Sequence, residues 1–126
     1  MYEDTFMTAR EFLATVREAA QRIDVLEKRI AFRKDLSEDT AELETERETA
    51  EREKLTNANE VMDAISHLRK ADQQTVMMKR YVNLKSWEEI AAGMDIGVRE
   101  VQKLHGKALP FLDELLGGGS DEVHPA

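Results

Sequence analysis

Long stretches of this chain contain no residue that breaks a helix. Only two prolines and six glycines occur among its 126 residues, and three of the glycines stand together near the C-terminus. Ala, Glu, Arg, Lys and Leu are abundant, and these residues have high helix propensity. The sequence therefore predicts an all-α protein with long helices.

Apolar residues near the N-terminus recur at alternating spacings of four and three, which is the heptad pattern of helices that pack along a seam. The seam consists of Phe12, Val16, Ala19, Ile23, Leu26 and Ile30. A helix from about residue 8 to residue 34 would be on the order of 40 Å long. Because such a helix is too long to stand alone on a surface, it needs a partner helix.

A second long helix is predicted over residues 38–69, beginning after Ser37, where acidic residues favour the positive end of the helix dipole. Residues 38–53 are acid-rich and are interpreted as a solvated face, and "TNAN" at 56–59 is a candidate kink. The apolar seam returns with Leu55, Ala58, Met62, Ile65 and Leu68. The two helices form either an antiparallel hairpin within one chain or a coiled coil between the copies of a homodimer.

Shorter segments follow, with a predicted helix at 72–82 and another starting after Ser86, which has Glu89 at the spacing of a capping box. Ala91 is a small residue where two helices could cross, and Asp95 lies four residues on, at the turn. This pattern is typical of a helix-turn-helix. Its predicted core is Ile90, Ala91, Met94, Ile96, Val101 and Leu104.

The second helix of this unit is predicted at about residues 97–109. Its outward side carries side chains typical of a DNA recognition helix. Arg, Lys and Gln reach base edges or phosphates when a helix enters the major groove. The candidate DNA-binding residues on this helix are Val98, Arg99, Gln102, Lys103 and Lys107. Arg80, Lys85 and Ser86 flank the preceding helix, where phosphates would pass.

The stretch "MKRYVNLKSWEEIAAGMDIGVREVQKLHGKAL" resembles region four of bacterial sigma factors, and more closely a group of small sigma-like proteins of phages and prophages of Gram-positive bacteria. The resemblance is specific over residues 60–112 and loose over 8–57. It implies a transcriptional regulator that binds double-stranded DNA in a bacterial cytoplasm. That group usually has Gly at the position of Asp95 and Ser at the position of Gly97, so a hydroxyl that could contact a phosphate is missing here.

Three segments follow from these patterns: a long-helix arm at 1–57, a helix-turn-helix domain at 58–116 and a flexible tail at 117–126. Pro110 should clash with the carbonyl of Gly106, so a kink or break is expected near Leu109. The formal net charge of −8 divides into −5, −1 and −2 over the three segments. The excess acid therefore lies mainly outside the segment that would bind DNA.

Other classes of protein are disfavoured by what the sequence lacks. There is no cysteine, no apolar run of the length that a membrane span needs, and an acidic rather than basic N-terminus. His67, His105 and His124 lack metal-ligand spacing, and no catalytic grouping or phosphate-binding loop occurs. We expect no enzyme, cofactor or small-molecule substrate. Two alternatives remain: a module that binds RNA polymerase without DNA, and a small-terminase-like DNA-packaging subunit.

Overall fold

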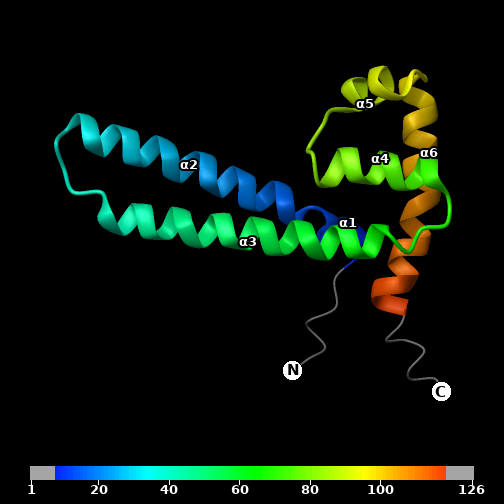
Figure 1. Ribbon diagram of the computed structural model, residues 1–126, viewed down its shortest axis with the longest axis horizontal. Helices are drawn as coiled ribbons and strands as arrows, with labels where there is room; N and C mark the ends of the chain where they lie inside the picture. Colours follow the sequence, from blue (N-terminus) through cyan, green and yellow to red (C-terminus); the bar gives the residue numbers. More distant parts are fainter. Residues whose placement is uncertain (1–7, 119–126) are drawn as a thin grey trace. The chain divides into compact units, whose positions relative to one another are not determined.

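The computed structural model describes residues 8–118, and over this range the secondary structure is helical, without strands. The all-α prediction is confirmed for these residues. The elements are α1 (Ala9–Leu13), α2 (Thr15–Asp35), α3 (Ala41–Ile65), α4 (Ala71–Tyr81), α5 (Trp87–Met94), α6 (Val98–Asp113) and a π-helical turn, η2 (Glu114–Gly118) (Figure 1). In this part of the chain, no helix combines the length and apolar character needed to cross a membrane.

The chain divides into two compact units, one formed by residues 15–59 and the other by residues 60–118 together with α1. The sequence had placed α1 in the arm and the boundary after residue 57. The predicted tail began at residue 117, but the helical turn η2 extends to Gly118. Residues 119–126 of that tail lie outside the described part of the chain.

In the unit of residues 15–59, α2 and α3 run antiparallel and side by side (Figure 1). Leu26 and Ile30 of α2 are buried in one cluster with Leu43 and Ala50 of α3, and Ile23 packs against this cluster. Val16 and Ala19 of the predicted seam are also buried. The sequence left open whether the seam pairs within or between chains. In this structure, Ile23, Leu26 and Ile30 of the seam pack against α3 of the same chain.

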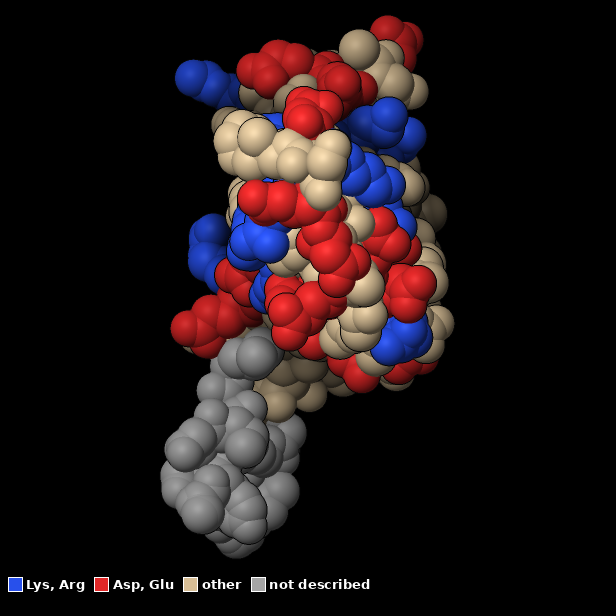
Figure 2. All heavy atoms as spheres, turned by 90° about the vertical axis from the view of Figure 1, so that its left-hand side faces the viewer, with Lys and Arg blue, Asp and Glu red and all other residues tan. Residues whose placement is uncertain are grey.

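Ion pairs connect the two helices outside their apolar seam. Arg22 Nη1 lies 3.0 Å from Glu53 Oε1, and Lys34 Nζ lies 3.6 Å from Glu44 Oε2. Each pair is solvated, so each contributes only about 0–1 kcal/mol. Figure 2 faces the connection between α2 and α3 and shows acidic side chains over much of that surface, with Lys and Arg among them. These ion pairs therefore help to define which residues of α2 lie beside which residues of α3, but they add little to the stability of the protein.

The helix α3 begins at Ala41, three residues later than predicted. Ser37 adopts a left-handed conformation with φ of 59°, and this conformation interrupts the helix that the acidic residues alone would favour. Thr40 is buried, and its hydroxyl donates a hydrogen bond of 2.8 Å to Glu44 Oε2, which lowers the pKa of Glu44. From Ala41, α3 continues as an uninterrupted helix through residues 56–59 to Ile65.

The predicted single helix over residues 8–34 is interrupted at Ala14, between α1 and α2. Thr8 caps α1 in a capping box with Glu11, and the Ala9 N–H donates a hydrogen bond of 2.8 Å to Asp113 Oδ1. In α1 the fully buried residues are Ala9 and Leu13, while Phe12 is only half-buried. The assignment of Phe12 to the seam of the arm is therefore wrong, because α1 packs with α6 and turns a different side inward.

The predicted apolar seam of the second long helix is also partly wrong. Leu55 is 71% exposed and Met62 is 37% exposed. The buried residues near the end of α3 and just beyond it are Val61, Ala64, Ile65 and Leu68. Several sets of spacings fit the same sequence, and the neighbouring helices determine which set is buried.

The α6 helix runs through Pro110 to Asp113 without the predicted break. Pro110 is exposed, while Leu109 and Leu112 on either side of it are buried. The carbonyl that the ring opposes belongs to Gly106, where no side chain adds to the crowding. Burial of the two leucines therefore keeps the chain helical past the proline.

Replacing Leu112 with alanine tests this packing. Leu112 is fully buried, so Leu112→Ala should lower the free energy of unfolding by about 2–5 kcal/mol. Leu55→Ala is the control, because Leu55 is 71% exposed and its removal should change stability by less than about 0.5 kcal/mol. Urea denaturation followed by circular dichroism measures both, and equal losses would contradict the assignment of the core.

Candidate nucleic-acid interface

The α5 helix begins with the predicted capping box. The Ser86 hydroxyl accepts a hydrogen bond of 3.1 Å from the Glu89 N–H, and Glu89 Oε1 accepts one of 2.9 Å from the Ser86 N–H. The hydrogen bond from the Ser86 backbone lowers the pKa of Glu89. These reciprocal bonds satisfy two amides at the start of α5, so the Ser86 hydroxyl has a structural partner.

The turn between α5 and α6 requires a left-handed residue, and Asp95 occupies that position with φ of 61° and ψ of 43°. Asp tolerates this conformation better than most residues. The Ile96 N–H then donates a hydrogen bond of 3.1 Å to the carbonyl of Ala91. Gly97 follows in an extended conformation as the N-cap of α6 and forms no side-chain cap.

Apolar side chains hold α5 and α6 together in the same compact unit. Ile90 and Val101 are fully buried, and Ala91 and Leu104 are nearly so. Met94 and Ile96 are half-buried at the edge of this cluster. Of the six residues predicted as the core of this two-helix unit, four are thus buried and two are half-buried.

The opposite side of α6 is polar and open. Arg99, Gln102, Lys103 and Lys107 are exposed, and Val98 is half-buried. The three cations follow one another at intervals of four residues, so they form a row about 12 Å long on one side of the helix. Within residues 8–118, none of the three forms a hydrogen bond or ion pair. The row is therefore available to an anionic partner.

The flanking residues that the sequence grouped with this row have partners within the protein. The guanidinium of Arg80 lies over the Trp87 ring at 4.1 Å from its centroid and donates a hydrogen bond of 3.0 Å to the carbonyl of Lys85. Arg80 is half-buried, whereas the side chain of Lys85 is exposed. Of Arg80, Lys85 and Ser86, only Lys85 has a side chain that forms no hydrogen bond or ion pair within residues 8–118.

Behind the row, His105 is buried in an aromatic cluster. Its Nε2 is hydrogen-bonded to the Tyr81 hydroxyl, and the Trp87 ring meets its edge at 5.0 Å between centroids. Burial, assisted by the charges of Arg10 and Arg80, lowers the pKa of His105 to about 4. His105 is therefore neutral near pH 7, and its buried hydrogen bond with the Tyr81 hydroxyl gives it a structural role. Its spacing from Val101, Leu104 and Ala108 was the signal in the sequence that it faces the core.

Sequence reasoning missed two cations beside this face. Arg69 and Lys70, just before α4, line a hollow of about 380 Å³ together with Lys107 and Phe111 of α6. All four residues belong to the same compact unit. No local pattern could have grouped them, because the segment that leads into α4 meets α6 only through tertiary packing. The row of cations on α6 thus continues onto a second segment.

The described residues contain no group of three or more His, Asp or Glu side chains arranged to hold a metal ion. Of the three histidines, His67 is exposed, His105 is buried and His124 lies outside the described residues. Comparisons of the chain with protein-family models, curated proteins and solved structures found no match.

Substitutions at Asp95 test the left-handed turn. Asp95→Val should lower the free energy of unfolding by about 1–2 kcal/mol, because a β-branched residue is strained at positive φ. Asp95→Gly should stay within about 1 kcal/mol of the parent protein, since glycine adopts this conformation freely but gains freedom in the unfolded chain. Thermal and urea unfolding measure both variants. An unchanged stability in the valine variant would show that the turn is not strained.

The burial of His105 predicts a pH dependence of stability. Its pKa is about 4 in the folded protein against 6.5 for an unperturbed histidine, so the unfolded chain binds the proton first. The contribution is complete above about pH 6.5 and is lost as the pH falls toward 4. Unfolding free energies measured over this window should fall less steeply in His105→Gln than in the parent protein. The control His67→Gln alters an exposed histidine and should retain the parent slope.

Proposed function

We propose that this protein is a sequence-specific DNA-binding transcriptional regulator of phage or prophage type, acting in a bacterial cytoplasm. In this proposal α5, the turn at Asp95 and α6 form a helix-turn-helix of the sigma-region-four kind, and α2 with α3 forms a coiled-coil arm. The observation that carries the proposal is the row of Arg99, Lys103 and Lys107, exposed and unpaired within residues 8–118, on the side of α6 opposite its buried stripe.

The proposed recognition helix is α6, because a B-DNA major groove about 12 Å wide admits one helix. Arg99 and Gln102 lie in its first half, where a helix of this class approaches base edges. Arginine pairs best with guanine and glutamine with adenine, and Val98 could contact a thymine methyl group. Lys103 and Lys107 follow along the same side and are the proposed phosphate contacts.

Arg69 and Lys70 extend this set of phosphate contacts. They share a hollow with Lys107, so a backbone that passes Lys107 comes within reach of all three charges. Arg80 has a different role in the proposal: its contacts with Trp87 and Lys85 hold the start of α5 in place. Ser86, which caps α5, acts in the same way.

The net charge of the chain determines which forces could drive DNA binding. With a net charge of −8, the whole protein is repelled by DNA at long range. Residues 58–116 sum to only −1, so the local row of cations can still dominate at contact. Binding should therefore depend on a small number of short-range contacts and weaken steeply with salt.

The first experiment selects binding fragments from bacterial and phage genomic DNA with the purified protein and identifies the enriched motif. Arg99→Ala combined with Lys103→Ala should then weaken binding to that motif at least tenfold, since the lost arginine–base contact alone is worth about 1–3 kcal/mol. It should also reduce the slope of log K against log salt concentration by about one for each phosphate that is no longer bound.

Arg17→Ala combined with Arg52→Ala is the matched control. It removes the same charge from residues 15–59, and binding should change by less than about threefold. Circular dichroism should show equal helix content in both double variants. Enrichment of no motif, together with capture of RNA polymerase, would reject DNA reading in favour of a polymerase-binding module. Equal loss of binding in both double variants would reject α6 as the recognition helix.

A further inference from the structure

The α2 helix has a second apolar side that no residue of α3 covers. Val25 and Phe32 are 54% and 63% exposed, and their spacing of seven residues places them on one side of the helix. Val25 and Phe32 line a hollow of about 460 Å³. Its other lining residues are Lys28, Arg29 and Arg33. Lys28 pairs with Asp24 at 3.0 Å and Arg33 with Glu38 at 3.6 Å, so Arg29 is the cation at the rim of this hollow that has no ion pair among the described residues.

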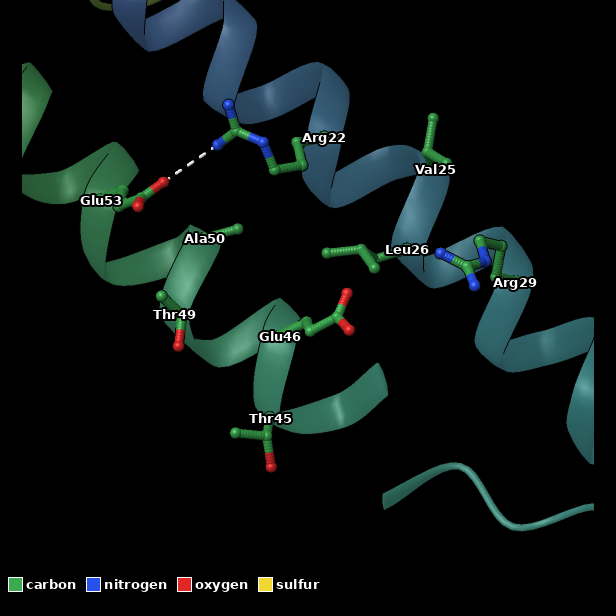
Figure 3. Close-up of a pocket in the computed structure, with 9 residues that line it drawn as sticks. All are labelled: Arg22, Val25, Leu26, Arg29, Thr45, Glu46, Thr49, Ala50 and Glu53. Carbon is green, nitrogen blue, oxygen red and sulfur yellow. Dashed lines mark hydrogen bonds and ion pairs between the residues drawn. The ribbon is translucent and has the colours of Figure 1, made fainter. Parts of the chain in front are cut away.

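A larger hollow of about 510 Å³ lies between this side of α2 and the adjoining side of α3. Figure 3 shows Leu26 and Ala50 pointing toward each other, with Arg22 and Glu53 joined above them. Glu46 reaches from α3 toward α2. The wall formed by α2 thus carries Arg22 and Arg29, while the wall formed by α3 carries Glu46 and Glu53. One groove has a basic wall and an acidic wall.

The charged pairs are also at matching levels along the helices. Arg22 lies beside Glu53, as their 3.0 Å ion pair shows. Since α2 and α3 are antiparallel, seven residues forward on α2 and seven residues back on α3 lead to Arg29 and Glu46, which line the same hollow. Each cation of the groove therefore has a carboxylate at its own height on the opposite wall.

We propose that the occupant of this groove is the same groove of a second copy of the chain, related by a two-fold axis parallel to the helices. Such an axis keeps the height of every residue and exchanges the two walls. It therefore sets α2 of one subunit against α3 of the other, with Arg29 facing Glu46 of the partner subunit and Arg22 facing Glu53 of the partner subunit. Two-fold interfaces use one self-complementary patch, and the charges of this groove meet that requirement.

The other two-fold arrangement is unfavourable. An axis perpendicular to the helices would set α2 against α2, so that Arg29 would face the basic wall of Arg22 and Arg29 of the partner subunit instead of Glu46. Like charges facing each other across an interface oppose association. In the proposed arrangement, Val25, which is 54% exposed, is covered without that repulsion, and Leu26 and Ala50 are already buried within each chain. The resulting interface has Val25 near its centre and charged side chains around it, as stable protein interfaces commonly have an apolar centre and a polar rim.

This inference does not depend on DNA binding, because all of its residues lie within the unit of residues 15–59. It differs from the alternative that the heptad seam joins two chains, since Ile23, Leu26 and Ile30 of that seam pack against α3 of the same chain. A dimer would give the protein two copies of α6. Regulators of the helix-turn-helix class often bind paired half-sites in this way.

Charge reversal on each wall tests the interface. The parent protein should sediment as a dimer at micromolar concentration in low salt. Arg29→Glu alone and Glu46→Arg alone should each weaken the dimer at least tenfold, because each places like charges face to face at two symmetry-related points. Circular dichroism and thermal unfolding verify that each variant remains folded.

Mixing the two variants separates contacts between chains from contacts within one chain. In a mixed dimer, the carboxylate introduced at position 29 meets the cation introduced at position 46 of the other subunit, while native Arg29 meets native Glu46. Equimolar Arg29→Glu and Glu46→Arg should therefore recover a dimer that neither forms alone. An effect confined to the fold of each chain could not be recovered by mixing.

Glu48→Arg is the matched control, since Glu48 is exposed two residues beyond Glu46 and so points to another side of α3. It should leave the dimer unchanged. A parent protein that remains monomeric would overturn the proposal, because the groove would then not bind a second copy of the chain. A dimer that resists both reversals, or one that mixing fails to restore, would overturn it as well.

Discussion

The buried stripe of α6 is the constraint on which the unit of residues 60–118 depends. Val101, Leu104, Ala108 and Leu112 lie on one side of this helix and are buried, and α1, α4 and α5 all contact it. Because these contacts fix the rotation of α6, its opposite side is fixed too. The exposure of Arg99, Lys103 and Lys107 is therefore a consequence of core packing, and any function of these cations relies on that packing.

The two units use charge in different ways. In residues 15–59, cations and carboxylates alternate between two helices and pair across them, as Arg22 and Glu53 do. On α6, three cations stand in a row without a partner among the described residues. The first pattern suits recognition of a surface that itself carries both positive and negative charges, such as the same surface of a second copy of the chain. The second suits a polyanion, which is why the acidic chain and its basic helix are compatible.

Local chemistry could be predicted closely and longer-range packing only in part. The capping box of Ser86, the left-handed Asp95 and the core positions Ile90 and Val101 follow from residues within about four positions of one another, where helix and turn rules apply. The assignments of Phe12 and Leu55 to apolar seams were wrong because several heptad registers fit the same residues. Which register is buried depends on a neighbouring helix, and Leu13 and Val61 were buried instead.

The sequence by itself determined that the chain is helical, where α5 and α6 begin, and which side of α6 is charged, because propensity, capping and periodicity are properties of nearby residues. Only the tertiary structure decided that α1 packs with α6, that the first seam is used within one chain, and that Arg69 and Lys70 lie beside Lys107. These outcomes depend on contacts between segments far apart in the sequence. The stabilising free energy of these contacts comes from apolar surface that both segments bury together, so neither segment alone predicts the contact.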